Sequence, residues 1–244
     1  MFSTELLRDY FRGNGLGVYA AGRAAGDRMS VAFANAITPV GPVAASDLAG
    51  RSPRKVLFYA RPEPHNARNL FDLGVMALAE AVRAGAFPGS WEFYGIGTSA
   101  ITRPVALAGG KVLHVLPRQG LGDYAALLKA HDVGLSLMYT PHPSLVPLEM
   151  ASAGLLTVTN TYATKTAERL RAISPNLIAV EATVPAIVAG LRQAAAGVDD
   201  CAARARGAQI NWSTDWAASF PPGMVRTIGS FLDGDDEPAM LPAA

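Results

Sequence analysis

The chain has 244 residues, of which 50% are hydrophobic and 17% are charged, so it is long and apolar enough to bury a substantial core. This composition excludes an intrinsically disordered chain. The 21 lysine and arginine residues nearly balance the 20 aspartate and glutamate residues, and the net charge of +1 argues against a dedicated nucleic-acid binder.

The cysteine content and the first residues indicate the cellular compartment. Cys201 is the single cysteine of the chain, which excludes an intramolecular disulfide and a thiolate metal site and fits a reducing compartment. Glu5, Arg8 and Asp9 interrupt the segment 1–12, so it forms neither a signal sequence nor a membrane span. We therefore expect a cytoplasmic protein with at most peripheral membrane association.

Residues 1–52 precede the region with the clearest pattern. Ser3 is placed to cap a short helix whose apolar residues recur at helical spacing from Leu6 to Phe11, and Gly13 starts a stop signal after it. The stretch from there to Pro53 is rich in alanine, glycine and proline, which predicts a linker with short turns.

From Arg54 onward, strand and helix patterns alternate. The predicted strands are 55–60, 91–96, 111–116, 132–137, 155–160 and 177–180, and the predicted helices are 69–84, one capped by Asp123, 147–153, 164–172 and 184–195. Strands that are apolar on both faces and alternate with helices predict an α/β fold, a doubly wound parallel sheet between two helix layers. We place this Rossmann-like domain at 53–200 and assign 201–244 to C-terminal helices and a flexible tail.

Two arginines follow the first predicted strand, at the edge of such a sheet where ligands bind. Arg61 and Arg68 lie in a loop ahead of a helix amino terminus, and guanidinium groups combined with a helix dipole are typical of a phosphate site. The alternative is that both side chains are solvated or form weak surface ion pairs. The loop alone does not decide between these interpretations.

The run 138–154 crosses from a strand end into a helix. Pro147 suits the first turn of that helix, and the helix dipole stabilises Glu149 within the same turn. A carboxylate in this position also accepts hydrogen bonds from the vicinal hydroxyls of a ribose. Spacing leaves both explanations of Glu149 open.

Taken together, these segments resemble a known enzyme family. Residues 55–195 are similar to the donor-binding half of GT-B glycosyltransferases of the family-four group, and most similar to the rhamnosyltransferases of bacterial rhamnan and surface-layer glycan synthesis. The resemblance rests on four segments of this sequence: Tyr59-Ala-Arg61-Pro62 with Arg68-Asn69, Asp132 to Met138, Pro141-His-Pro-Ser144 with Pro147-Leu-Glu149, and Val158-Thr-Asn160.

The resemblance implies which residues would bind the diphosphate of a nucleotide-sugar donor. Arg61 and Arg68 would contact it and stabilise the departing nucleoside diphosphate, and Ser144, Leu145 and Val146 would line it.

The same resemblance implies how the nucleoside would be held. Pro117 and Arg118 would contact the base, and Glu149 would bind the ribose. Many family members carry a second glutamate eight positions earlier that faces the sugar, and this sequence has Pro141 there. His142 is the candidate to replace that glutamate as a hydrogen-bonding group.

The expected function follows from this likeness. The chain is expected to be a glycosyltransferase, a hexosyltransferase that transfers rhamnose or another deoxyhexose from a dTDP- or UDP-type donor to a polysaccharide or glycan acceptor, with no metal and no cofactor. Enzymes of this fold have two Rossmann-like domains, so residues 1–52 are interpreted as a remnant of the acceptor domain with a linker. The chain would then be a fragment, a subunit completed by a partner chain that supplies the acceptor domain, or a relic. The alternative is a noncatalytic module that binds a nucleotide or a partner; a sugar-nucleotide epimerase of the same fold would need further acidic and histidine residues in a full cleft.

Overall fold

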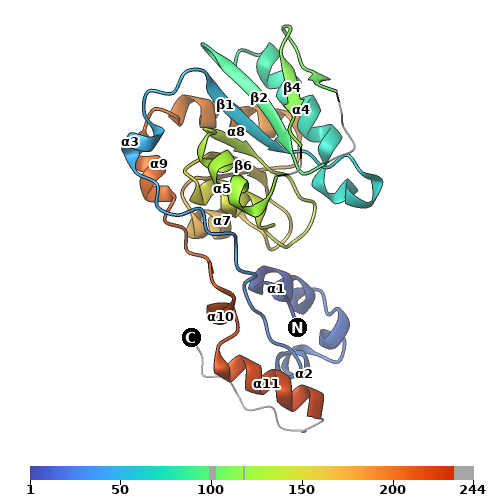
Figure 1. Cartoon of the computed structure of the whole chain (residues 1–244). Coiled ribbons are helices and arrows are strands. Elements are labelled where there is room, and N and C mark those ends of the chain that lie inside the picture. The colour runs from blue at the N-terminus through green and yellow to red at the C-terminus, as the bar shows by residue number, and fades with distance from the viewer. Residues whose placement is uncertain (99–102, 118, 234–244) are drawn as a thin grey trace. The chain divides into compact units, whose positions relative to one another are not determined.

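The structure is a computed structural model that describes residues 1–98, 103–117 and 119–233 (Figure 1). It divides into two compact units: a terminal unit, Met1–Ile37 with the segment from Trp212 onward, and a sheet unit, Thr38–Asn211. The described elements are, in chain order, α1 (Glu5–Gly13), η1 (Gly17–Tyr19), α2 (Arg23–Arg28), α3 (Ala45–Leu48), β1 (Arg54–Tyr59), η2 (Pro64–Asn69), α4 (Phe71–Arg83), β2 (Trp91–Ile96), β3 (Val105–Ala106), β4 (Val112–Val115), α5 (Leu121–Lys129), β5 (Val133–Leu135), α6 (Val146–Ser152), β6 (Leu156–Asn160), α7 (Ala167–Ile173), β7 (Leu177–Val180), α8 (Val184–Gly197), α9 (Cys201–Gly207), α10 (Trp216–Ser219) and α11 (Pro222–Asp233).

The sheet unit is built on seven described strands in the order β3-β4-β2-β1-β5-β6-β7. Every pairing is parallel except that of β3 with β4, which adds a short antiparallel edge. The chain runs outward from β1 in both directions, through β2 and β4 on one side and β5 to β7 on the other. The predicted doubly wound parallel sheet is confirmed, and β3 is an addition that the sequence pattern did not predict.

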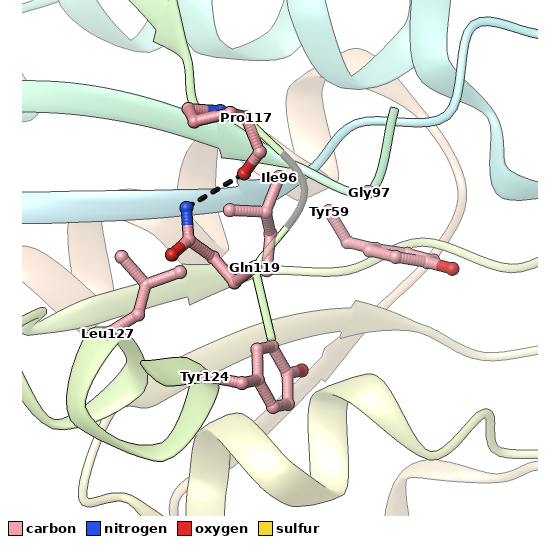
Figure 2. A pocket seen from close by; sticks show the side chains of 7 residues that line it. All are labelled: Tyr59, Ile96, Gly97, Pro117, Gln119, Tyr124 and Leu127. Atoms are coloured by element: carbon pink, nitrogen blue, oxygen red, sulfur yellow. Dashed lines mark hydrogen bonds between the residues drawn. The ribbon is translucent and has the colours of Figure 1, made fainter. Parts of the chain in front are cut away.

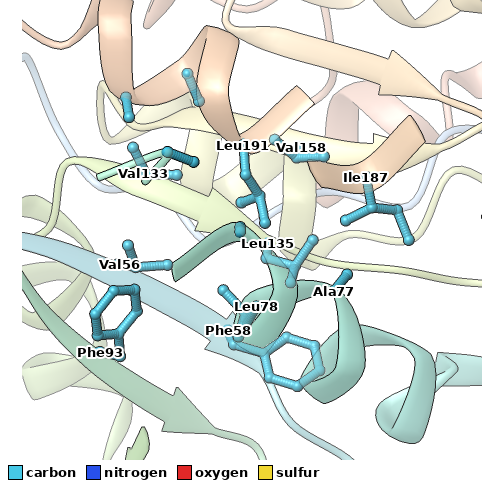
Figure 3. Close-up of a cluster of buried hydrophobic side chains, with 14 of the residues drawn as sticks. Val56, Phe58, Ala77, Leu78, Phe93, Val133, Leu135, Val158, Ile187 and Leu191 are labelled. Carbon is cyan, nitrogen blue, oxygen red and sulfur yellow. The ribbon is translucent and has the colours of Figure 1, made fainter. Parts of the chain in front are cut away.

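The central strands are buried on both faces, which explains their apolar sequences. Val56 and Phe58 of β1 point toward α4 and α8, whereas Leu57 between them packs with residues of α5 and α6. The cluster on the α4 and α8 face appears in Figure 3 and includes Val56, Phe58, Ala77, Leu78, Phe93, Val133, Leu135, Val158, Ile187 and Leu191. This alternation of buried side chains fixes the register of the sheet between its helix layers.

A buried carboxylate ties the amino ends of the strands together. Asp132, which directly precedes β5, is fully buried, and its Oδ2 accepts the backbone N–H of Lys55 at 3.0 Å. Its Oδ1 lies 3.2 Å from Arg54 Nη1 and 3.3 Å from Nη2 of Arg204, which is also fully buried. Arg51 Nη1 also lies 3.4 Å from Asp132 Oδ1 and completes the cluster. The cations and the backbone amide together satisfy a charge that burial alone would destabilise.

Several predicted boundaries differ from the structure. Residues 38–52, predicted as linker, belong to the sheet unit and include α3, which lies beside α9 (Figure 1). Leu48 of α3 is fully buried. The predicted C-terminal segment from 201 contributes α9 to the same unit. The cap of α5 is Gly120 rather than Asp123, because the helix begins two residues earlier than its polar signal.

The terminal unit is a small helical cluster formed by both ends of the described chain. The N-cap of α1 is Thr4, whose hydroxyl accepts the N–H of Leu7, and not the predicted Ser3. Arg12 forms an ion pair with Asp27 at 2.6 Å, and the indole N–H of Trp212 donates to the carbonyl of Asn35. No helix in the described part of the chain is both long and apolar enough to cross a bilayer.

We predict that Asp132→Asn lowers the free energy of unfolding by about 3–5 kcal/mol, because it leaves the buried Arg204 guanidinium without its counter-ion. Urea denaturation measures this change. The control is Asp199→Ala, since Asp199 also pairs with Arg54 but its side chain is 83% exposed, and we expect little change there. Equal effects of the two substitutions would contradict the proposed importance of the buried cluster.

Candidate functional site

Backbone strain gathers at the carboxyl edge of the sheet. The described non-glycine residues with φ in the left-handed region are Leu70 at 51°, Ser144 at 67° and Ala163 at 46°. They lie in the connections that follow β1, β5 and β6, which are neighbours in the sheet. Such conformations cost roughly 1–3 kcal/mol each and persist where the surroundings hold them, often at functional sites. The carboxyl edge is also where open α/β sheets bind ligands.

A cavity of about 170 Å3 opens at this edge (Figure 2). Its walls come from the end of β1, from β2 and the residue after it, from the connection after β4 and from α5. Gln119 donates its side-chain N–H to the carbonyl of Pro117 at 2.8 Å, at the rim of the cavity. The lining residues are Tyr59, Ile96, Gly97, Pro117, Gln119, Tyr124 and Leu127. Aromatic faces with a few polar groups are typical of small-molecule sites.

Glu149 does not line the cavity but is hydrogen-bonded to Tyr124, which does, and two donors hold its carboxylate. The residue is 6% exposed in the first turn of α6. Its Oε1 accepts the backbone N–H of Thr38 at 3.0 Å, and its Oε2 accepts the hydroxyl of Tyr124 at 2.9 Å. Burial, followed by the charge of Glu149, raises the pKa of Tyr124, so this phenol remains a donor to the carboxylate. Tyr124 thereby links the cavity to Glu149.

Arg61 is held in place by Tyr59, a second tyrosine that lines the cavity, and by Glu63. Its Nη1 donates to the Tyr59 hydroxyl at 3.0 Å, and its Nε donates to Glu63 Oε2 at 3.1 Å. Desolvation alone would raise the pKa of Glu63, but hydrogen bonds from Thr98, from its own backbone N–H and from Arg61 lower this pKa to about 2. Gly97 permits the arrangement, since a Cβ there would lie 2.7 Å from the Tyr59 ring.

Arg68 lies between β1 and α4, as the sequence predicted, and its contact with a diphosphate remains a prediction. It lies in η2 with an exposed side chain, and its backbone carbonyl accepts the N–H of Tyr139 at 2.7 Å. Arg61 and Glu149 are each hydrogen-bonded to a tyrosine that lines the cavity, whereas the Arg68 backbone contacts the connection between β5 and α6. We call residues 138–144 of that connection the β5–α6 loop.

His142 is a neutral hydrogen-bond donor within the β5–α6 loop. Its Nδ1 accepts the backbone N–H of Ser144 at 3.0 Å, so the proton of the neutral ring is on Nε2. Desolvation and then the charge of Lys165 lower the pKa of His142 to about 4. At neutral pH the imidazole therefore offers an N–H and carries no charge, which fits the predicted hydrogen-bonding role better than general acid catalysis.

Lys165 is a residue near this loop that the sequence did not single out. It is fully buried in the turn between β6 and α7, and its Nζ donates to the carbonyl of Met138 at 2.7 Å. The sequence around it, Ala-Thr-Lys-Thr, is typical of a solvated helix start, so no pattern marks this lysine as buried.

The remaining predicted residues that the structure describes lie at the same edge. Pro117 lines the cavity, Ser144 is buried, and Leu145 and Val146 form the N-cap and first residue of α6. Arg118 lies outside the described residues. Their contacts with a donor remain predictions. Within 1–98, 103–117 and 119–233, no group of three or more histidine, cysteine or acidic residues is placed to hold a metal ion.

A family model described as the C-terminal domain of WsaF matches residues 54–192, which is more than half of the chain. The chain belongs to this family. RfbC of Myxococcus xanthus, an O-antigen biosynthesis protein, is 36% identical over 165 residues, or 64% of this chain and 11% of that protein. The segment matched by the family model, 54–192, contains the whole candidate site except Thr38. The chain spans only a small part of the length of RfbC.

Two solved structures share the fold of this WsaF C-terminal domain family member. Sucrose-phosphate synthase from Thermosynechococcus elongatus aligns with a TM-score of 0.55 and 14% identity, over 96% of this chain and 57% of that chain. The pneumococcal O-GlcNAc transferase GtfA, solved in complex with UDP and GlcNAc, aligns with a TM-score of 0.51 and 14% identity. The alignment covers 85% of this chain and 40% of that chain. The predicted Rossmann-like α/β fold of GT-B glycosyltransferases is confirmed.

We predict that stability falls as the pH is lowered from 6.5 to 5, because unfolded histidine binds protons in this range and His142, with its pKa of about 4, does not. The loss attributable to His142 is about 1.5 kcal/mol. Urea denaturation at several pH values measures it. His131, whose pKa is also about 4, adds a similar dependence, so His142→Gln should remove only part of the slope. An unchanged slope in His142→Gln would show that this ring titrates normally.

Proposed function

We propose that this chain is the donor-binding part of a glycosyltransferase of polysaccharide biosynthesis. The donor would be a dTDP- or UDP-type nucleotide sugar carrying rhamnose or another deoxyhexose, and the acceptor a growing glycan. The proposal is supported by membership in the WsaF C-terminal domain family, by the likeness to an O-antigen biosynthesis protein and by the GT-B fold. The single observation that carries it is that two tyrosines lining one cavity each hold a charged group, Tyr59 holding Arg61 and Tyr124 holding Glu149.

The lining of this cavity supports the binding of a nucleoside. Tyr59 and Tyr124 offer aromatic surface to a base, and the amide of Gln119 at the rim offers a hydrogen-bonding group. Glu149 would accept the ribose hydroxyls. One protein donor is already bound to each of its oxygens, which leaves lone pairs for the sugar and fixes the direction in which they point.

The departing diphosphate would be stabilised by the cations beside the nucleoside. Charge develops on the leaving group as the glycosidic bond breaks, and preorganised donors lower the energy of that state. Arg61 is preorganised by Tyr59 and Glu63, and Arg68 lies on the adjoining η2. The Nε2–H of His142 would donate a hydrogen bond to the transferred sugar or its phosphate, in place of the carboxylate that Pro141 replaces.

The decisive test of this function is turnover. Release of nucleoside diphosphate from dTDP-rhamnose or another nucleotide sugar, dependent on a glycan acceptor, is expected when the chain is assayed with the products of neighbouring genes. Nucleotide binding without such release under any of these conditions would favour the noncatalytic module instead.

Glu149→Ala should weaken the binding of UDP or dTDP by roughly 1–3 kcal/mol, because a buried, charged hydrogen-bond acceptor is lost. Isothermal titration calorimetry measures the affinity, and urea denaturation establishes that the variant is folded. Glu181→Ala is the control, since Glu181 is an exposed residue after β7. Unchanged affinity in a folded Glu149→Ala protein would reject the ribose-binding role.

Tyr124→Phe should weaken nucleotide affinity by about 0.5–1.5 kcal/mol, less than Glu149→Ala, because it keeps the ring in the cavity and removes only the hydrogen bond to Glu149. The same calorimetric titration measures it. If Tyr124→Phe were as damaging as Glu149→Ala, the phenol rather than the carboxylate would be the main contact of the nucleoside.

A further inference from the structure

Lys165 closes a strained turn at the carboxyl edge of the sheet. Backbone hydrogen bonds pair it with Tyr162 in both directions, and Ala163 between them has φ of 46°. The turn holds the ammonium group against the β5–α6 loop. Lys165 Nζ and Asn160 Nδ2 both donate to the carbonyl of Met138, at 2.7 and 3.1 Å, and Asn160 Oδ1 accepts the N–H of Met138 at 2.7 Å.

The charge of Lys165 has no counter-ion in the protein as described. The side chain is fully buried, yet no carboxylate among the described residues lies within ion-pair distance of Nζ, and one of its three N–H groups is used on Met138. Asn160 already donates to the same carbonyl, so Met138 does not require a lysine. A buried ammonium without a partner is costly and is uncommon unless it serves a ligand.

The charged residues near Lys165 indicate that the ligand is negatively charged. Arg68 contacts the same loop through its backbone, and Arg61 lies on the adjoining strand end, so positive charge gathers at this edge. His142 is close enough for its pKa to be lowered by Lys165 and is itself neutral. Arg61 is already paired with Glu63, whereas no described carboxylate pairs with Lys165, and a diphosphate would supply the negative charge that Lys165 lacks.

We propose that Lys165 is the positioning residue of the diphosphate subsite: it fixes the β5–α6 loop through Met138, and the donor diphosphate, rather than a side chain of this protein, neutralises its charge. The inference rests on the proposed function, since it takes a nucleoside diphosphate as the ligand. Lys165 acts from beneath the loop and is not assigned a contact with the donor.

This role has a proton-linked consequence. Desolvation lowers the pKa of Lys165 to about 7, so the group is largely neutral at pH 8 in the free protein. A bound diphosphate favours the charged form, and binding at pH 8 should therefore take up about one proton from solvent. The titratable or charged side chains on the surrounding segments are Tyr139, His142, Tyr162, Glu168 and Arg169, and His142, with its pKa of about 4, stays neutral throughout this range.

The test is calorimetric titration of the whole chain with UDP and with dTDP at pH 8, in buffers of different ionisation enthalpy. At this pH the nucleotide phosphates are fully ionised, so proton uptake reports on the protein. We expect uptake by the unmodified protein and none by Lys165→Met or by Lys165→Arg, whose charge is permanent. Affinity should fall at least tenfold in Lys165→Met. It should stay unchanged in Lys111→Met, since Lys111 also donates to a single carbonyl but is exposed.

Unfolding experiments separate this role from a structural one. At pH 8 Lys165 is a buried, largely neutral amine whose one carbonyl partner also accepts from Asn160, so Lys165→Met should be at least as stable as the unmodified protein. A lysine needed only for folding would instead make this variant less stable. Nucleotide binding by the unmodified protein without proton uptake, or equal affinity in Lys165→Met, would overturn the role of Lys165 and leave the proposed function standing. Failure of the unmodified protein to bind either nucleotide would overturn both.

Discussion

Parallel pairing of β1 with β2 on one side and β5 on the other is the constraint on which the candidate site depends. Parallel strands end at the same edge, so connections that are distant in sequence meet there. Tyr59 is the last residue of β1, and Gly97 directly follows β2. The β5–α6 loop follows β5, and Lys165 lies in the turn after β6. An antiparallel sheet of the same strands would distribute these residues over two edges.

The two edges of the sheet differ in whether a buried charge has a counter-ion within the described residues. At the amino edge, Asp132 is surrounded by three arginines and a backbone amide, so its charge is fully compensated and the cluster serves stability. At the carboxyl edge, Glu63 compensates Arg61, but Lys165 is buried and no carboxylate among the described residues pairs with it. Compensation inside the protein favours a rigid fold, whereas an incomplete set of charges favours an external anion.

The cavity itself is organised before any ligand is present. Tyr59 is bonded to Arg61 and Tyr124 to Glu149, so each charged group is oriented by an aromatic residue that also lines the cavity. Groups held in this way lose little conformational freedom on binding. Gly97 is needed for this arrangement, because any side chain at that position would displace the Tyr59 ring and the aliphatic part of Arg61.

The sequence by itself determined the layered parallel sheet, because strands that are apolar on both faces and alternate with helices have few other ways to be buried. It also singled out Arg61 and Glu149 as candidate site residues, because they stand at the ends of elements that periodicity predicts well. The pairing of Glu149 with Thr38, 111 positions earlier, and the burial of Lys165 were decided by the tertiary structure alone. Burial and partnership depend on which distant segments cover a side chain, and neither local propensity nor spacing carries that information.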